Sequence, residues 1–218
     1  VIEALASCKQ GLTRKEIVER LKLPSGGTLT KVLRELIDCD FVRGYNTRER
    51  KIKQKDQIYQ LIDLYTLFYM QFCHPASTDT AFWTHQMGKP RQNTWYGLAF
   101  ERICMLHIPQ IKQQLGIAQI YTEYYSWRSK LSTPASQIDL LIERADNLVN
   151  LCEIKYSQAP YSITKEEDMR IRTRIADFVG ETKIRHGVLT TLITTFGLRP
   201  NPYSSIAQVQ LTMDDLFV

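Results

Sequence analysis

Residues 136–157 read SQIDLLIERADNLVNLCEIKYS, and apolar and polar residues alternate along both halves of this stretch. A period of two places successive side chains on opposite faces of a β-strand. Between the halves, Ala145-Asp146-Asn147 supplies residue types that tolerate the positive φ of a tight turn. The stretch therefore predicts a β-hairpin. The residues predicted to share one face of its first strand are Ile138, Leu140 and Ile142.

A hairpin register that is symmetric about the centre of the turn would gather three charged side chains. In that register Asp139 lies opposite Glu153, and Lys155 projects from the same face. The same register pairs Leu141 with Leu151. It requires an odd-numbered loop or a bulge, because a two-residue Asp-Asn turn would shift the pairing by one residue.

These three charged groups have a chemical use. Two carboxylates can hold a hard divalent cation through their oxygens, and a nearby ammonium can steady a phosphate or help to deprotonate a water molecule. The alternative is a solvated sheet face on which Lys155 pairs with Glu153 or Asp139. The hairpin alone leaves both interpretations open.

Length and composition limit the class of protein. With 218 residues, 44% of them hydrophobic and 23% charged, the chain is long enough for two small domains, which we expect. The net charge of +5 is too mild to indicate a nucleic-acid partner by itself. No signal peptide is visible, and the most apolar run, residues 61–73, is too short to cross a bilayer. We therefore expect a cytoplasmic protein with no membrane partner. Because the chain starts without Met inside a helical pattern, we also expect it to be a fragment.

Cysteine and histidine are spaced unlike the ligands of zinc. The five cysteines are odd in number and form no CxxC pair, which is typical of reduced thiols in a cytosolic protein. The four histidines are scattered along the chain. The sequence therefore predicts no zinc site.

Residues 1–62 predict three short helices followed by a hairpin. Thr13 and Glu16 have the spacing of a capping box that opens the second helix, and Thr28 is predicted to cap the third. Two helices across a Gly-containing turn, followed by a two-stranded ribbon, are typical of a winged helix-turn-helix. The segment 61–73 is then predicted to be a helix that is apolar on most sides and hence buried.

The predicted wing is strongly basic, since the segment 43–55 contains a single acid, Glu49. This density of charge suits the phosphates of double-stranded DNA. Winged helices also serve as protein-docking or autoinhibitory modules, and basic loops are commonly just solvated, so this alternative stays open. The candidate nucleic-acid-binding residues are Lys31 and Arg34 on the third helix, with Arg43, Arg48, Arg50, Lys51, Lys53 and Lys55 on the wing.

A second run of elements follows the irregular segment 74–93. A helix is predicted to restart at Asn93 or Thr94, and it carries Glu101 among apolar and small neighbours, where a carboxylate either meets a cation or forms a salt bridge. The elements predicted after it are a short helix from Pro109 to Gly116, a strand within 117–128, the hairpin, a helix over 164–181 and strands over 187–195 and 209–211. The order helix, three strands, helix, strand predicts an α/β domain (α+β for the whole chain) with a mixed sheet flanked by helices.

That order, with acids on the first helix and on the second and third strands, resembles the restriction-endonuclease-like PD-(D/E)XK nuclease fold. The segments WYGLAFE (95–101), QIDLLIER (137–144), NLCEIKYS (150–157) and LITTFGL (192–198) are similar to the C-terminal region of predicted P-loop ATPases, called the DEXX-box ATPase C-terminal domain. In that family a nucleotide-binding domain precedes a winged helix and a nuclease-like domain. The resemblance covers essentially the whole chain and implies a winged helix over residues 1–62, a helical linker over 63–93 and a nuclease-like domain over 94–218.

The resemblance also implies roles for particular residues. Asp139 and Glu153 would be the metal-binding carboxylates, with Glu101 as a supporting acid, and Lys155 would act with them as the catalytic lysine on a site for Mg²⁺ or Mn²⁺. Ile138 replaces the proline of the family signature. No Walker A pattern GxxxxGK[ST] occurs, so we expect no ATP site in this chain and an ATPase domain as its partner in the parent protein.

Three functions compete at this point. The first is a metal-dependent phosphodiesterase, in which Mg²⁺ is held by Asp139, Glu153 and the carbonyl of Ile154. The second is a non-catalytic module of an ATPase, in which the winged helix binds nucleic acid or a protein and the nuclease-like fold is a scaffold. The third is a winged-helix transcription regulator with an unrelated sensor domain.

Overall fold

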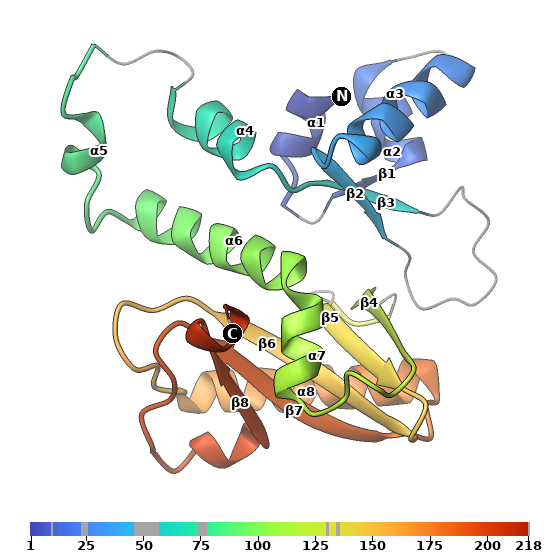
Figure 1. The fold of residues 1–218 in the computed structure, drawn as a ribbon, viewed down its shortest axis with the longest axis vertical. Helices are drawn as coiled ribbons and strands as arrows, with labels where there is room; N and C mark the ends of the chain where they lie inside the picture. Colours follow the sequence, from blue (N-terminus) through green and yellow to red (C-terminus); the bar gives the residue numbers. More distant parts are fainter. Residues whose placement is uncertain are drawn as a thin grey trace. The chain divides into compact units, whose positions relative to one another are not determined.

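The structure is a computed structural model, and it describes residues 1–9, 11–22, 26–45, 57–73, 78–129, 131–133 and 136–217. It divides into two compact units, Val1–Ala99 and Phe100–Val218, which can be followed along the colour gradient of Figure 1. The division falls within one helix, α6 (Pro90–Leu106). Across the described ranges, no helix combines the length and the apolar character that crossing a membrane requires. The domain limits predicted at residues 62 and 93 stay predictions.

The N-terminal unit begins with helices and a small antiparallel sheet. Its first elements are α1 (Ile2–Ala6), β1 (Leu12–Thr13), α2 (Arg14–Leu21), α3 (Gly27–Asp38), β2 (Val42–Tyr45) and β3 (Ile58–Leu61). The strands lie in the order β1-β3-β2, so β3 pairs with both of the others. The core of this unit includes the buried side chains of Leu5, Ile17, Leu33 and Leu61.

Helix capping in this unit matches the prediction from the sequence at α2 but not at α3. The capping box of α2 is confirmed, because the Glu16 amide donates to Thr13 Oγ1 (3.3 Å) and the Thr13 amide donates to Glu16 Oε2 (2.7 Å). The predicted cap of α3 is wrong. That helix starts earlier than expected, with Gly26 as its N-cap, so Thr28 lies inside the helix.

The predicted buried helix over 61–73 is replaced by three shorter pieces. Leu61 ends β3, and Asp63 then caps α4 (Leu64–Phe68) by accepting from the Thr66 amide at 2.6 Å. A π-helical turn, η2, covers Tyr69–Cys73. Tyr65 is 75% exposed, so this segment is amphipathic rather than buried. The short α5 (Phe82–His85) follows, and α6 then starts at Pro90, before the earliest predicted start, since proline suits the first turn of a helix.

The C-terminal unit is built on a five-stranded mixed sheet, which confirms the α/β prediction at the level of a mixed α+β architecture. The strands are β4 (Thr122–Arg128), β5 (Gln137–Arg144), β6 (Leu148–Lys155), β7 (Gly187–Thr194) and β8 (Val209–Thr212), in that order. The first three strands are antiparallel neighbours, and the last three are parallel. Because parallel neighbours need a crossover, α8 (Lys165–Thr182) connects β6 to β7. The remaining elements are α7 (Ile108–Gln114), η3 (Ser204–Ile206) and η4 (Asp214–Leu216).

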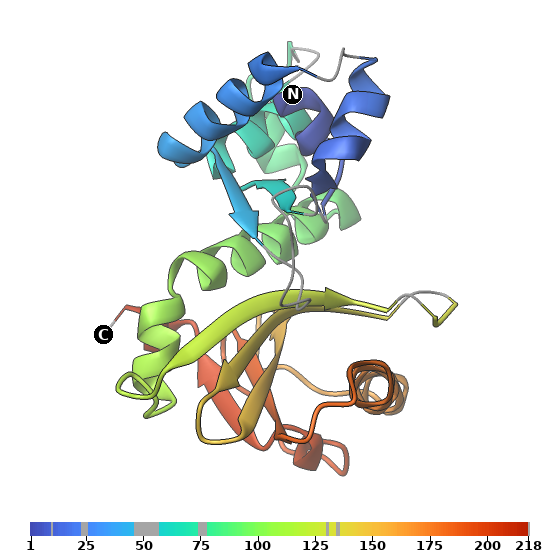
Figure 2. The same ribbon diagram turned by 90° about the vertical axis from the view of Figure 1, so that its right-hand side faces the viewer.

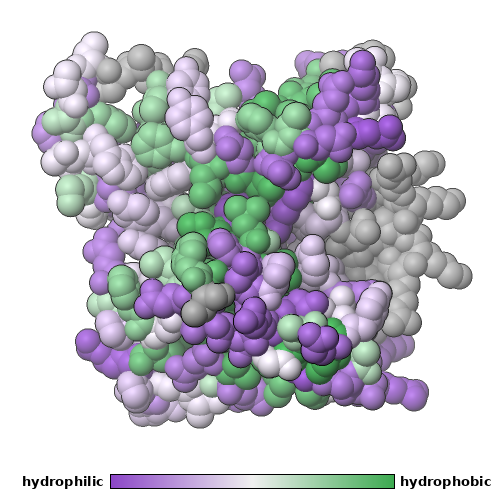
Figure 3. Space-filling model, viewed as in Figure 1, coloured by the Kyte–Doolittle hydropathy of each residue, from purple (hydrophilic) through white to green (hydrophobic). Residues whose placement is uncertain are grey.

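Helices cover both faces of this sheet (Figure 2). Leu140 and Cys152 pack in one cluster with Ile111 of α7, whereas Leu141 and Leu151 pack in another cluster with α8. Because adjacent residues of a strand point to opposite faces, α7 and α8 lie on opposite sides. Hydrophilic and hydrophobic residues are intermixed on the visible surface of the C-terminal unit (Figure 3).

The predicted hairpin is present, and its register is the predicted one from Leu140 to Glu143, but the ladder ends before the predicted pair of Asp139 with Glu153. Leu141 pairs with Leu151, and a loop of three residues joins the strands. Asn147, the last of the three, has a φ of 64°, which is a common way to close such a loop. The odd-numbered loop that the symmetric register required is therefore confirmed.

One position of β5 departs from regular alternation. Two residues of this strand, Asp139 and Leu140, lie opposite the single residue Ser126 of β4, which defines a β-bulge. Ile138 consequently packs with Leu141 on the α8 side. The prediction that Ile138 shares a face with Leu140 is wrong, because the extra residue reverses the alternation at that point.

Candidate functional site

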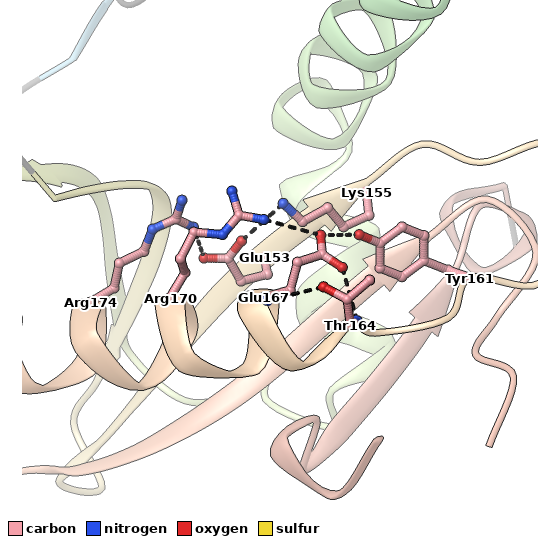
Figure 4. Close-up of polar contacts among 7 residues, drawn as sticks. All are labelled: Glu153, Lys155, Tyr161, Thr164, Glu167, Arg170 and Arg174. Carbon is pink, nitrogen blue, oxygen red and sulfur yellow. Dashed lines mark hydrogen bonds and ion pairs between the residues drawn. The ribbon is translucent and has the colours of Figure 1, made fainter. Parts of the chain in front are cut away.

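Glu153 is a carboxylate held almost out of water on the α8 side of the sheet. Its side chain is 6% exposed, and its Oε1 accepts a hydrogen bond from Nη1 of Arg174 on α8. Its Oε2 lies 3.6 Å from Nζ of Lys155, two residues further along β6 (Figure 4). A buried carboxylate is tolerated only when it is paired, and here each of its oxygens has a cationic partner.

Arg174 is the functional neighbour that the sequence analysis missed. It lies three residues after Ile171 and four residues before Phe178, both of which are buried. This spacing places it on the inward stripe of α8, from which its guanidinium reaches the sheet. An arginine on an otherwise apolar stripe was the available signal, but the residue that it meets, Glu153, could not be named without the packing of α8.

A second carboxylate, Glu167, lies beside the first in Figure 4. Its Oε1 accepts from the hydroxyl of Tyr161 and lies 3.8 Å from Nη2 of Arg170. Its other oxygen accepts from the Thr164 amide at 3.2 Å, which completes the capping box of α8. Glu167 is therefore held by its own helix terminus.

Tyr161 connects these two carboxylates electrostatically. Burial raises the pKa of the Tyr161 hydroxyl, the hydrogen bond to Glu167 raises it further, and the charge of Glu153 adds a smaller contribution in the same direction. The hydroxyl therefore stays protonated at neutral pH and can donate to Glu167. Lys155 and Arg174 contact Glu153, and Arg170 lies beside Glu167, so each of the two carboxylates has a cationic neighbour (Figure 4).

Asp139 occupies the bulge of β5, and its side chain is exposed. The pairing of β5 with β6 extends as far as Leu140 opposite Cys152, one residue before Asp139 and Glu153 would meet. Oδ1 of Asp139 accepts from Nε2 of Gln137 at 2.7 Å. The structure thus brings Glu153 and Lys155 together, whereas Asp139 is hydrogen-bonded to Gln137 on its own strand.

Glu101 comes from the other side of the sheet. Its neighbours on α6, Phe100 and Cys104, are buried in the cluster that contains Cys152, on the face opposite α8. Burial raises the pKa of the Cys104 thiol, and the charges of Cys152 and then Glu101 raise it further. The participation of Glu101 in a shared site with Glu153 stays a prediction.

The donor atoms of the predicted ligands decide which kind of cation they could hold. Within the part of the chain that the structure describes, no group of three or more His, Cys, Asp and Glu side chains is placed to hold a metal ion. The predicted pair, Asp139 and Glu153, offers only oxygen donors, which suit Mg²⁺ or Mn²⁺. Glu153 also attracts positive charge already, since Arg174 and Lys155 both contact it. The predicted ligands therefore match a hard cation in donor type only. Both oxygens of Glu153 have cationic partners and Asp139 is hydrogen-bonded to Gln137, so the described residues do not form a metal site as they stand.

The predicted nucleic-acid-binding residues of the N-terminal unit are described only in part. Lys31 and Arg34 are exposed on α3, and Lys31 lies 3.8 Å from Glu35 one turn later. Arg43 is half-buried, and its Nε donates to Gln60 Oε1 at 2.9 Å. This arginine therefore also supports the packing of β2 on β3. The predicted wing residues Arg48, Arg50, Lys51, Lys53 and Lys55 lie outside the described residues.

Comparison with known proteins does not assign the chain to a family. No family model matches the sequence, and no curated protein matches it. The chain is similar to a solved structure, the crystal structure of a protein of unknown function, AF1548, at 15% sequence identity and a TM-score of 0.37. The match covers 52% of this chain and 64% of the length of that one.

Proposed function

We propose that this chain is a nucleic-acid-binding protein whose C-terminal unit is a nuclease-like domain of the PD-(D/E)XK type, acting on the phosphodiester backbone. The observation that carries the proposal is the pair Glu153 and Lys155, which lie two residues apart on the same face of β6 and contact each other beside Arg174 of α8. The order helix, three antiparallel strands, helix and parallel strand supports it.

We propose that the N-terminal unit is a winged helix-turn-helix. In support, α2 and α3 are followed by the pair β2 and β3, and the short β1 between α1 and α2 completes the sheet order β1-β3-β2. Lys31 and Arg34 on α3 are exposed. In this proposal they contact phosphates of a DNA duplex.

In this proposal the residues of the C-terminal unit have distinct roles. Lys155 stabilises the negative charge that develops on a phosphate, as a fixed cation at the edge of a largely buried site. Asp139 and Glu153, with Glu101 as a supporting acid, are proposed as ligands of Mg²⁺ or Mn²⁺, which would require Asp139 and Glu153 to leave the partners that they have in this structure. When bound, such a cation polarises the phosphate and lowers the pKa of a water molecule.

Cleavage of a labelled DNA duplex, with and without Mg²⁺, tests this proposal. Lys155→Ala should lower the cleavage rate by about 100-fold or more, because it removes a preorganised cation from the reacting phosphate. Asp139→Asn should abolish the dependence on Mg²⁺. Lys112→Ala is the matched control, since Lys112 lies on α7 on the other face of the sheet, and it should leave the rate unchanged. Equal rates for the Lys155 and Lys112 variants would rule out the assigned role of Lys155.

A second candidate is a non-catalytic nucleic-acid-binding or protein-binding module of an ATPase. It is favoured by one observation, namely that both oxygens of Glu153 are already paired with protein cations. This candidate predicts duplex binding without cleavage under every metal condition. Under both candidate functions, the ATPase domain of the parent protein would be the partner of this chain. The chain expressed alone should bind no ATP.

Salt dependence tests the DNA-binding part of both candidates. The affinity for a duplex should fall steeply between two salt concentrations. Changing Arg48, Arg50, Lys51 and Lys53 to Ala should reduce the slope by about one for each phosphate that the wing no longer neutralises. Identical affinities for the two proteins would exclude the wing as a DNA-binding element.

A further inference from the structure

Arg170 is the most exposed of the three cationic side chains drawn in Figure 4. It is 63% exposed, whereas Lys155 and Arg174 are each 29% exposed. The neighbouring carboxylates, Glu153 and Glu167, are only 6% and 14% exposed. In Figure 4 the side-chain nitrogens of the three cations lie in a row on one side of these carboxylates. A ligand that approaches from the solvent therefore meets Arg170 before it meets either acid.

The guanidinium of Arg170 makes one long contact with the protein. Its Nη2 lies 3.8 Å from Glu167 Oε1, which is too long for a hydrogen bond. Glu167 already accepts from the Tyr161 hydroxyl and from the Thr164 amide, so this carboxylate has other partners. A guanidinium carries five N–H donors in a planar fork. Glu167 can thus orient Arg170 electrostatically while the donors of Arg170 remain for a ligand.

Arg172, two residues further along α8, is committed to the protein instead. It is 60% exposed, yet its Nε and Nη2 both donate to Asp168, at 2.9 and 3.0 Å. Two residues along an α-helix are about 200° apart, so the two arginines project from nearly opposite sides of α8. Exposure alone does not distinguish Arg170 from Arg172, whereas hydrogen bonding to a carboxylate does.

Arg170 also lies at a position in the fold where α/β proteins bind ligands. Lys155 is the last residue of β6, and it pairs with Thr194, the last residue of the parallel strand β7. Ligands of open α/β sheets bind outside the carboxyl ends of such strands. Arg170 belongs to the second turn of α8, the helix that follows this end of β6, and Figure 4 shows it beside Lys155.

We infer that Arg170 binds a phosphate of a nucleic-acid backbone next to the phosphate at Lys155, and so sets the position of the strand in the proposed site. The inference rests on the proposed function in taking a nucleic acid as the ligand and Lys155 as a phosphate contact. It adds a second contact, which comes from α8 and needs no metal ion.

Arginine is suited to this contact. Its fork can donate two parallel hydrogen bonds to the oxygens of one phosphate, whereas the ammonium of Lys155 acts as a point charge. Contacts to phosphates fix the register and orientation of a strand without reading its bases. The contribution of Arg170 to binding should therefore be the same for duplexes of different sequence.

Fluorescence anisotropy of the full chain with a labelled DNA duplex in EDTA tests the inference without any cleavage. Arg170→Gln is made in the wild type and in the variant that carries the four wing substitutions described above, so that binding by the wing does not hide the effect. We expect Arg170→Gln to weaken binding severalfold. The slope of log affinity against log salt should fall in magnitude by about 0.9, the value for one duplex phosphate that is no longer neutralised.

Arg172→Gln is the matched control. It removes the same charge from the same helix at nearly the same exposure, but its guanidinium is already bound to Asp168, so the affinity and the salt slope should stay close to those of the parent protein. Arg170→Lys should keep the salt slope and lose part of the affinity, because it keeps the charge and removes the fork. Melting curves without DNA check that each variant folds.

Inorganic phosphate separates a backbone contact from a general anion site. At a concentration equal to that of the DNA phosphates, it should leave the duplex bound. Displacement of the duplex at that concentration would overturn the inference, since a single anion would then satisfy the site.

The remaining outcomes separate this inference from the proposed function. Unchanged affinity of Arg170→Gln in both backgrounds overturns the inference alone if the wild type still cleaves DNA. Equal losses for the Arg170 and Arg172 variants overturn it too, because the effect would then be one of net charge. No DNA binding by the wild type overturns both proposals. A loss specific to Arg170, together with no cleavage by the wild type under any metal condition, would uphold the inference and refute the nuclease proposal.

Discussion

The two ends of the β5–β6 hairpin each hold an arginine–carboxylate pair. The two pairs differ in the sequence separation of their partners and in their burial. At the turn, Asp146 accepts from Arg144 two residues earlier, with Nε at 2.9 Å from Oδ1, and the aspartate side chain is 37% exposed. At the open end, Glu153 is 6% exposed and accepts from Arg174, 21 residues away. One pair belongs to a local turn, and the other depends on the docking of a helix.

The burial of each pair sets how much it contributes to stability. A pair between near neighbours whose carboxylate is exposed, such as Asp146 with Arg144, contributes little to stability, because water and salt screen the carboxylate. A buried carboxylate that loses its partner leaves an uncompensated charge, which is costly. The buried pair at the open end therefore makes the free energy of folding depend on keeping both partners. This pair lies in the proposed functional site.

Removing the distant partner should have the largest effect on stability. Arg174→Ala leaves Glu153 with only the longer contact to Lys155, and we expect it to lower the free energy of unfolding by about 3 kcal/mol, at the lower end of the range for buried pairs because Arg174 is partly exposed. Urea denaturation measures the change. Replacing both residues by Leu should recover most of the loss, and a cost below about 1 kcal/mol would mean that water already screens the pair.

The turn end of the hairpin was predictable from residues 136–157 because its determinants are local. Alternation defines the strands, and the three-residue loop with Asn147 at positive φ sets the register, so Leu141 opposite Leu151 followed directly. The capping boxes at Thr13 and Thr164 are local in the same way, although only the first was predicted as such.

The open end could not be predicted in the same way, because it depends on packing between distant segments. The bulge at Asp139 arises where β5 pairs with β4, and nothing in the sequence of β5 alone indicates which residue is extra. The pairing of Glu153 with Arg174 requires the position of α8 over β6. The start of α3 at Gly27 instead of at a Thr28 cap shows the same limit on a smaller scale.

A buried polar pair near the turn should give the next largest effect. Nδ2 of Asn150, which is 1% exposed, donates to Thr191 Oγ1 at 3.0 Å. Thr191→Val keeps the shape of the side chain but leaves this amide without the bond, and we expect a loss of about 1.5 kcal/mol in the free energy of unfolding, measured by urea denaturation.

Thr194→Val on the same strand is the control for that substitution. The Thr194 side chain is buried, and its Oγ1 has no hydrogen-bond partner among the described residues. Its replacement should be neutral or slightly stabilising, because it removes an unsatisfied polar group. Equal losses for the two variants would show that packing, and not the Asn150 bond, sets the cost.

Substitutions that strain the backbone of the turn should change the free energy of unfolding less. Asn147 has a φ of 64°, a region in which β-branched residues are strained. We expect Asn147→Val to lower the free energy of unfolding by about 1 kcal/mol, and Asn147→Gly to change it by no more than a few tenths of that amount, since glycine adopts this conformation freely. Chemical denaturation of the two variants in parallel provides the measurement. A loss on substitution by glycine as large as that by valine would show that the Asn147 side chain matters more than its φ.

The pair of Asp146 with Arg144 at the turn should have the smallest effect on stability. The pH dependence of the melting temperature measures this effect. The hydrogen bond from Arg144 lowers the pKa of Asp146 below its ordinary value. A carboxyl group whose pKa is depressed by folding stabilises the protein at pH values above its unfolded pKa, about 3.9, and this contribution is lost as the pH falls through the lower folded pKa. The wild type should therefore melt slightly above Asp146→Asn at pH 6, and the gap should shrink as the pH falls below about 4. Melting curves at about pH 6 and about pH 3 for both proteins, on either side of the unfolded pKa, measure it. A gap of the same size at both pH values would mean that Asp146 acts through the geometry of the turn, and the contrast between a screened local pair and a buried distant pair would then rest on Glu153 alone.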